Sequence, residues 1–166
     1  DMQRARVADF SLAEALGVPL YTAAFLSCLA FSERPDRKKA LLSGVLIGMA
    51  ALTKAGILIF APLYAVFYLF RHGEAFSTKL KRAALLAASV AAVLAPVAVH
   101  NWRASGDFIP LTWHAGLNFY IGNNAGSQGI YNTPPGIRSN IEGQIADSVM
   151  IAETEERRKL KPSEVS

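Results

Sequence analysis

Three long stretches of the sequence are apolar and almost free of charge, and they restrict the possible folds more than any other feature. They cover residues 10–31, 40–70 and 83–99, and Glu14 and Lys54 are the only charged residues within them. As a helix, the first stretch reaches about 33 Å, which is enough to cross the hydrocarbon core of a bilayer. The sequence therefore predicts an all-α, polytopic transmembrane protein.

The second stretch, residues 40–70, is long for a single span, and Lys54 lies near its centre. A lysine at the centre of a bilayer is unfavourable by about 3 kcal/mol or more. Basic residues flank the stretch on both sides, at 34–39 and 71–82. Short loops rich in lysine and arginine stay on the cytoplasmic side, so both flanks belong on the same face of the membrane. We therefore predict two short helices joined by a turn at Lys54 near the outer surface.

The matched basic flanks define a topology for the whole chain. The predicted membrane helices cover residues 10–31, 40–52, 57–70 and 83–99. They belong to a multi-pass domain of the inner (plasma) membrane, residues 1–103. Residues 104–166 form a segment outside the bilayer, and the topology places residues 100–166 on the periplasmic or outer side.

The outer segment has three predicted parts. Residues 108–112 are predicted as a short strand, and the glycine- and asparagine-rich residues 116–136 as an ordered loop on which aromatic side chains pack. Residues 139–160 are predicted as an amphipathic helix that lies on the membrane or on the protein. The apolar stripe of this helix is predicted to contain Ile141, Ile145, Val149 and Ala152.

Charge and cysteine content exclude several functional classes. The net charge of +4 is spread over short loops and forms no basic face with stacking aromatic residues, which excludes nucleic acid as a partner. Cys28 is the only cysteine and lies in an apolar run, so it builds neither a disulfide framework nor a zinc site, and we interpret it as part of the core. The sequence also contains no Walker-type phosphate loop, no His-Glu-x-x-His motif and no nucleophile elbow.

The two charged residues in apolar stretches are candidate functional groups. Lys54 lies between two apolar half-spans, where its ammonium suits an anionic partner such as a lipid phosphate because it is a compact point charge. The alternative is a structural pair with a carboxylate. Glu14 is either an interfacial carboxylate that reaches the head groups or an acid that lines a cavity.

Two further groups of polar residues follow the third apolar stretch. The first group, at the outer end of that stretch, contains His100, Asn101, Trp102 and Arg103. An interfacial belt also accounts for a tryptophan and an arginine at this place. The second group offers donors and acceptors to a hydroxylated ligand and contains His114, Asn118, Tyr120, Asn123 and Asn124. Turn chemistry is the other explanation for the last two asparagines.

Several strings resemble segments of C-type membrane glycosyltransferases. This group includes the protein O-mannosyltransferases (glycosyltransferase family 39) and bacterial relatives such as the aminoarabinose transferases. Residues 46–54 (LIGMAALTK) resemble the Leu-Thr-Lys segment of the family, and residues 96–102 (PVAVHNW) resemble a segment that ends a membrane helix. Residues 116–124 (GLNFYIGNN) are similar to the outer-face loop that follows, and residues 152–166 to the stretch before the next helix.

The resemblance implies transfer of a sugar from a polyprenyl-phosphate donor to a glycan, lipid or protein acceptor on the outer face of a bacterial cell envelope. Under this interpretation Lys54 and Arg103 bind the donor phosphate, and Glu14, His100 and Asn101 line the cavity. The catalytic base of the family is an aspartate in the first outer loop, which we expect upstream of this chain. The identity of the sugar and the need for a divalent metal ion stay open.

Two positions depart from the family pattern, and two other functional classes compete with it. The usual tryptophan and arginine at the helix end are replaced by Val97 and His100, so the role of that arginine passes to Arg103 or is lost. The first competitor is a membrane transporter or lipid flippase, in which Glu14 and Lys54 bind substrate or a coupling ion near broken helices. The second is a structural membrane subunit without chemistry.

Overall fold

The computed structural model describes residues 2–71, 73–112, 114–127 and 133–165, and their side chains except those of residues 2–14 and Ala115. Every regular element in these ranges is helical, and none is a strand. The all-α prediction is therefore confirmed. The chain divides into two compact units, Asp1–Val97 and Ala98–Ser166, which we describe separately as unit 1 and unit 2.

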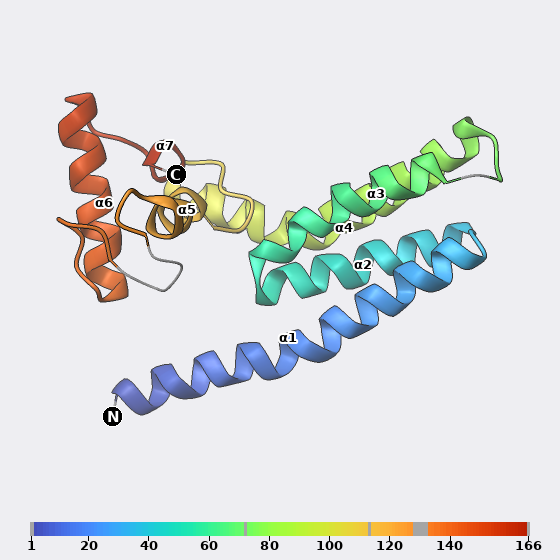
Figure 1. Cartoon of the computed structure of the whole chain (residues 1–166), viewed down its shortest axis with the longest axis horizontal. Coiled ribbons are helices and arrows are strands. Elements are labelled where there is room, and N and C mark those ends of the chain that lie inside the picture. The colour runs from blue at the N-terminus through green and yellow to red at the C-terminus, as the bar shows by residue number, and fades with distance from the viewer. Residues whose placement is uncertain (1, 72, 113, 128–132, 166) are drawn as a thin grey trace. The chain divides into compact units, whose positions relative to one another are not determined.

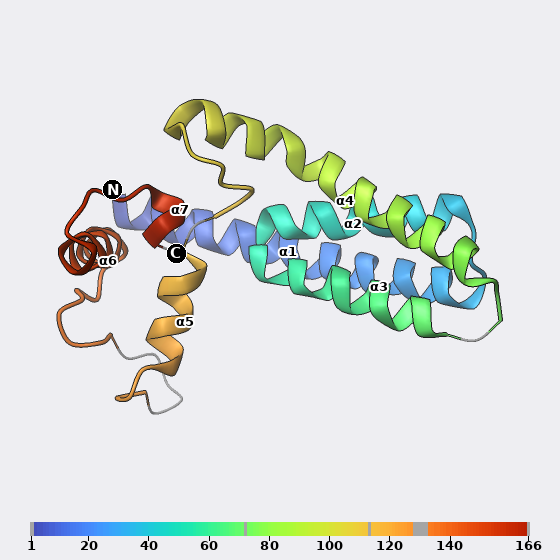
Figure 2. The same ribbon diagram turned by 90° about the horizontal axis from the view of Figure 1, so that it is seen from above.

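Unit 1 is built from long helices joined by short turns (Figure 1). Its elements are α1 (Met2–Glu33), α2 (Arg37–Thr53), the 3₁₀ helix η1 (Ala55–Ile59), α3 (Phe60–Phe70) and the part of α4 (Phe76–Ser105) that ends at Val97. Figures 1 and 2 both show α1 and α2 side by side over the length of α2. Helices α1 and α4 both begin before the predicted spans, because apolar content marks only the part of a helix suited to lipid.

The break expected at Lys54 is present. Thr53 is the last residue of α2, and Lys54 has an extended backbone with φ −152° and ψ 108°. The Lys54 N–H still donates to the Ala50 carbonyl at 3.1 Å, and the Lys54 carbonyl accepts from the Ile57 N–H at 3.2 Å, which starts η1. The α-helix resumes only at Phe60, later than predicted. Glycine and β-branched residues between 56 and 59 favour an α-helix less than leucine or alanine does.

Helices α2 and α4 approach each other most closely at two glycines of α2. A Cβ atom on Gly44 would lie 2.4 Å from the Leu86 carbonyl oxygen and 2.6 Å from the Ser89 Cβ. One turn later, a Cβ on Gly48 would lie 2.7 Å from the Val93 Cβ. This small-xxx-small spacing lets helix backbones come into van der Waals contact, as it does between helices in membranes.

Hydroxyl groups and aromatic rings join α1 to its neighbours. Ser27 in α1 is hydrogen-bonded to Ser43 in α2 at 2.8 Å. The Tyr64 hydroxyl of α3 donates to the Cys28 carbonyl at 2.6 Å and lies 2.8 Å from the Ser32 hydroxyl. Cys28 is buried here, which confirms its assignment to the core. The polar atoms buried at these contacts are thus paired with one another, as a low-dielectric interior requires.

Much of the outer surface of unit 1 is apolar, including Val18, Ile59, Leu63 and Phe70, whose exposed fractions are 62%, 71%, 63% and 82%. Among the described residues, two helices are long and apolar enough to cross a membrane, Ala15–Glu33 and Phe76–Ser105. This surface is compatible with contact with lipid. The apolar helix Ala55–Phe70 is shorter, and the four-span arrangement stays a prediction.

Unit 2 contains the end of α4 and the helices α5 (Ala115–Asn123), α6 (Ile141–Glu156) and α7 (Pro162–Val165). The strand predicted at 108–112 is wrong, because this segment is irregular. Its backbone is held by side chains instead: Asn101 Nδ2 donates to the Ile109 carbonyl at 3.0 Å. The loop predicted from residue 116 is also wrong in its first part, where α5 forms. Leu117 and Ile121, one turn apart, are both buried, and this packing outweighs the turn propensity of the glycines and asparagines.

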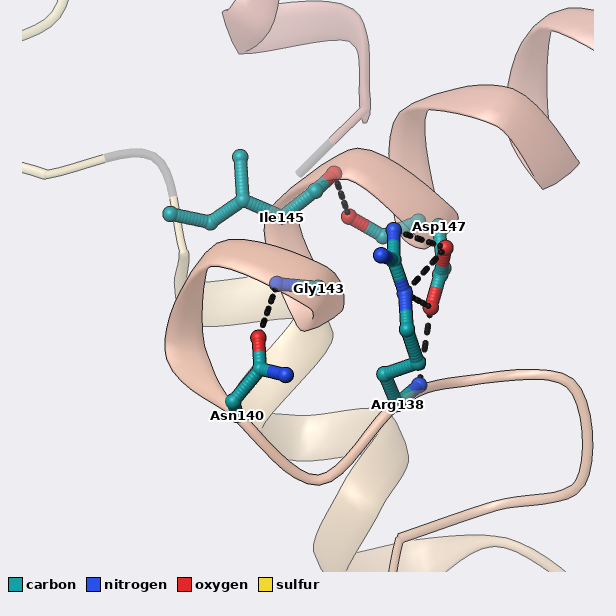
Figure 3. Close-up of polar contacts among 6 residues, drawn as sticks. Arg138, Asn140, Gly143, Ile145 and Asp147 are labelled. Carbon is teal, nitrogen blue, oxygen red and sulfur yellow. Dashed lines mark hydrogen bonds and ion pairs between the residues drawn. The ribbon is translucent and has the colours of Figure 1, made fainter.

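The helix predicted at 139–160 is confirmed as α6, but its predicted apolar stripe is not its buried face. Ile141 is 71% exposed, whereas the buried residues of the helix are Gly143 and Asp147. Asn140 caps the N-terminus, because its Oδ1 accepts a hydrogen bond from the Gly143 N–H (Figure 3). At the C-terminus, Arg157 adopts a left-handed backbone with φ 54°.

Candidate functional site

The helix break in unit 1 forms a first candidate site, which we call the Lys54 site and define as Tyr21, Thr53 and Lys54. The exposed Lys54 follows directly on the end of α2. Thr53 donates its hydroxyl proton to the Ala50 carbonyl at 2.7 Å, and its Oγ1 lies 3.2 Å from the Tyr21 hydroxyl of α1. A hydroxyl from a second helix is thereby held at Thr53, the residue that precedes Lys54.

An apolar cavity of about 230 Å³ lies beside this site. Its lining comes from α1, η1 and α3 and consists of Tyr21, Ala24, Phe25, Ile57 and Phe60. Tyr21 belongs to both the cavity and the hydrogen-bonded pair with Thr53. Tyr21 therefore borders an apolar space, and its partner Thr53 directly precedes the lysine in the chain. A lysine and an apolar space at one helix break suit an amphiphile with an anionic head group.

The first predicted group after the third apolar stretch lies at the end of α4 in unit 2. His100 and Arg103 are exposed and three residues apart, so they share a face of the helix. Asn101 has a structural role, since its amide holds the Ile109 carbonyl and its own carbonyl accepts from Ser105 Oγ at 2.7 Å. Lys54 lies in the other unit, and the side chain of Glu14 is outside the described residues. A cavity shared by these residues stays a prediction.

The predicted substrate loop is mainly helix α5, and its two last asparagines end that helix. Asn123 Nδ2 donates to the Phe119 carbonyl at 2.9 Å. Asn124 Nδ2 donates to the Tyr120 and Ile121 carbonyls at 3.1 and 3.0 Å, while its Oδ1 accepts from the Gly126 N–H at 2.9 Å. These amides therefore hydrogen-bond to backbone carbonyls at the end of the helix. Neither asparagine has the left-handed backbone that the turn explanation expects, since Asn123 is helical and Asn124 is extended.

The other three residues of that loop have different surroundings. Asn118 and Tyr120 are exposed on α5. His114 precedes the helix, its Nδ1 lies 3.1 Å from Thr112 Oγ1, and burial lowers the pKa of its ring. A neutral imidazole near pH 7 follows from that direction. A substrate role for these three residues stays a prediction.

Unit 2 also contains a cavity of about 280 Å³ between its helices. Its lining consists of Gly116, Leu117, Tyr120, Pro135, Ile137, Ser148, Ile151, Ala152, Glu155 and Val165. Among these, only Tyr120 was singled out from the sequence as a site residue. The spacing of Ser148, Ile151 and Glu155 along α6 was the available signal, because residues three, four and seven apart share a helix face.

An ion pair that the sequence analysis missed holds the segment before α6 (Figure 3). The Arg138 guanidinium binds the Asp147 carboxylate through Nη2–Oδ1 at 2.8 Å and Nε–Oδ2 at 2.9 Å, and the Arg138 N–H donates to Oδ2 at 2.8 Å. These three donors lower the pKa of Asp147. A Cβ on Gly143 would lie 2.5 Å from the Arg138 Cβ, so the glycine gives the arginine its space.

No group of three or more His, Cys, Asp or Glu residues in the described part of the chain is placed to hold a metal ion. The chain matches no protein-family model, no curated protein and no solved structure.

Proposed function

We propose that this chain is part of an integral-membrane glycosyltransferase that moves a sugar from a polyprenyl-phosphate donor to an acceptor on the outer face of the membrane. The observation that supports it is the Lys54 site: a lysine at the break between two apolar helices, directly after a threonine whose hydroxyl pairs with Tyr21, which lines an apolar cavity. A polyprenyl-phosphate donor fits such a site, because it carries an anionic phosphate on a hydrocarbon chain. The resemblance of residues 46–54 to the transferase segment supports the same function.

Transfer of the sugar leaves negative charge on the departing lipid phosphate, and in this proposal Lys54 stabilises that charge. A positioned cation favours the transition state because negative charge develops there. The proposal assigns no catalytic base within this chain and expects a carboxylate of the whole protein to activate the acceptor hydroxyl.

The test replaces Lys54 in the full-length protein and measures transfer from a polyprenyl-phosphate sugar in proteoliposomes. A charge-assisted contact is worth about 1.5–3 kcal/mol, so Lys54→Met is expected to lower transfer efficiency by about 10- to 150-fold. Lys54→Arg keeps the charge and should retain part of the activity. Lys159→Met removes an exposed lysine of unit 2 and serves as the matched control.

The outcome separates the proposed function from its rivals. If Lys54 stabilises the departing phosphate, turnover falls as well as donor affinity. Near-normal transfer by a folded Lys54→Met protein would contradict this role. Movement of a lipid or solute without sugar transfer by the unmodified protein would favour a transporter or flippase.

The proposal includes a multi-pass arrangement in which both basic turns of unit 1 face the cytoplasm. Cysteine labelling tests it at Glu33 and Ser77, which are exposed, in a Cys28→Ala background. Ser32 is unsuitable because it is buried and hydrogen-bonded to Tyr64. Both cysteines should react only from the cytoplasmic side, and a cysteine at Glu156 only from the outer side. Labelling of Glu33→Cys and Ser77→Cys from opposite sides would contradict the topology.

A further inference from the structure

The end of unit 1 that lies away from Lys54 contains two turns and most of the charged residues of the unit. Figures 1 and 2 both show the turn between α1 and α2 and the turn between α3 and α4 at the same end of these helices. Residues 33–39 and 71–82 contain eight lysines and arginines and three acidic residues. This end, which we call the basic end, therefore attracts anions.

A polar cavity of about 200 Å³ lies between the two turns. Its lining consists of Ser32, Glu33, Pro35, Tyr68, Arg71, Gly73, Glu74 and Lys79. Two of these charges already have partners. Lys79 Nζ donates to the Leu69 carbonyl at 2.7 Å and to the Arg71 carbonyl, and Glu74 forms an ion pair with Arg82.

Glu33 and Arg71 are the other two charged residues of this cavity, and Arg71 is the cation of the two. Its side chain is exposed, and within the described part of the chain no carboxylate forms an ion pair with it. Its backbone is fixed, because the Arg71 N–H donates to the Tyr68 carbonyl at 3.3 Å and its carbonyl accepts from Lys79. The guanidinium thus extends from a backbone held by hydrogen bonds. Its planar set of N–H donors can bind two phosphate oxygens at once.

An apolar cavity of about 450 Å³ adjoins the polar one. It lies between α1 and α3 and is lined by Phe25, Cys28, Leu29, Ser32, Phe60, Leu63, Tyr64, Phe67 and Arg71. Ser32 and Arg71 line both cavities. Arg71 therefore lies where the two cavities meet. Polar side chains line the cavity on one side of it, and aromatic and leucine side chains line the cavity on the other side.

We propose that the basic end binds one anionic phospholipid, with its phosphodiester at Arg71 and an acyl chain in the groove between α1 and α3. A free anion fills only the polar cavity, and an uncharged apolar partner fills only the groove. A phospholipid fits both, and basic pockets between membrane helices on the cytoplasmic side bind such head groups. The site is distinct from the donor site proposed at Lys54 and does not depend on sugar transfer.

The experiment is a lipid titration of the purified full-length protein in detergent, followed by native mass spectrometry. The probes are phosphatidylglycerol and phosphatidylcholine with identical acyl chains. The unmodified protein should bind one phosphatidylglycerol in preference to phosphatidylcholine. Arg71→Gln should lower phosphatidylglycerol affinity about tenfold and remove the preference. Arg37→Gln, an exposed arginine at the same end that lines neither cavity, is the matched control.

Three outcomes overturn the proposal. The first is the absence of a phosphatidylglycerol preference in the unmodified protein. The second is an equal loss in Arg71→Gln and Arg37→Gln, which indicates a diffuse charge effect. The third is full competition by sn-glycerol 3-phosphate, which has the anionic head but no acyl chain and so indicates a site for a free anion. Thermal unfolding in the same detergent checks that each variant is folded, and Phe67→Ala, which shortens the groove wall, should weaken binding of both lipids.

Discussion

Units 1 and 2 are both helical, but different interactions hold their helices. In unit 1, helix contacts rest on small residues such as Gly44 and Gly48 and on hydroxyl pairs such as Ser27 with Ser43. In unit 2, α6 is held by a capping side chain and by a charged pair, in which Arg138 of the preceding segment binds Asp147. Lipid is as apolar as leucine, so helices in a bilayer gain little from burying apolar surface and depend on close fit. A small unit in water has little apolar core and gains more from satisfied polar groups. The difference therefore agrees with the proposed placement of unit 1 in lipid and unit 2 in water.

The largest expected effect comes from filling the contact between α2 and α4. In Gly44→Ala, the new methyl group would lie 2.4 Å from the Leu86 carbonyl oxygen, which belongs to the backbone and cannot rotate away. We expect a loss of about 2–3 kcal/mol in the free energy of unfolding, measured by thermal unfolding of the full-length protein in detergent. Gly56→Ala is the matched control, because nothing lies within 4 Å of its added Cβ. Equal stability of the two variants would show that the close approach is not what holds unit 1.

The second prediction concerns acid, which should weaken unit 2 before unit 1. The pKa of Asp147 is lowered by Arg138, so the carboxylate stabilises the folded state wherever it is ionised in the native protein. That contribution is complete above about pH 5, decreases as the pH falls below the ordinary aspartate pKa of about 3.9, and is gone below the lowered folded pKa. The pKa values of Asp107 and Glu164 in the same unit are lowered too, by Ser163 and by Lys161 with Arg158 respectively.

Hydrogen exchange of α6 amides, compared with those of residues 44–53 in α2, measures this difference. The first turn of α2 is left out because the pKa of its capping residue Asp36 is lowered as well. Exchange in α6 should accelerate as the pH is lowered, after correction for the intrinsic pH dependence. Asp147→Asn should remove much of the pH dependence and weaken α6 at neutral pH, while Glu156→Gln, an exposed acid of the same helix, should change neither. Simultaneous loss of protection in α2 and α6 would contradict a separate electrostatic basis for unit 2.

The smallest expected effect is that of a helix cap. Asn140→Ala removes the side-chain acceptor of the Gly143 N–H and should destabilise α6 by about 1 kcal/mol. Asn140→Asp keeps an acceptor and should restore most of that loss. Exchange of the first-turn amides of α6 reports the change directly. An Asn140→Ala loss larger than that of Asp147→Asn would mean that the cap, and not the ion pair, is the main support of unit 2.

The sequence predicted the long helices and the break at Lys54 because both depend on local properties. Apolar stretches of membrane length fold as helices, and a lysine followed by Ala55 and Gly56 inside such a stretch marks an interruption. The helix at 139–160 was predictable for the same reason, since it begins after an asparagine and contains few residues that disfavour helix.

Errors arose where contacts distant in sequence decide the structure. The segment 108–112 has the composition of a strand but no partner strand among the described residues, and Asp107 instead accepts hydrogen bonds from Ser163, 56 positions away. The buried face of α6 was misassigned because it contains Gly143 and Asp147. A pattern of hydrophobic residues assigns an aspartate to the exposed face of a helix and does not assign a glycine to either face. Arg138 makes burial of Asp147 favourable, and this pairing spans nine residues. For the candidate site, a charge in an apolar run identified Lys54, whereas nothing local indicated that Tyr21 lies beside Thr53.

The paired glycines of α2 also limit how unit 1 can move. Gly44 lies against Leu86 and Ser89 of α4, and Gly48, one turn later, against Val93. Two such contacts at different heights fix both the rotation and the translation of α2 along α4, so α2 cannot act as a piston. Ala55–Ile59 follows Lys54 as a 3₁₀ helix, whose hydrogen bonds have poorer geometry than those of an α-helix. The glycines therefore restrict α2 more than the short segment that follows it.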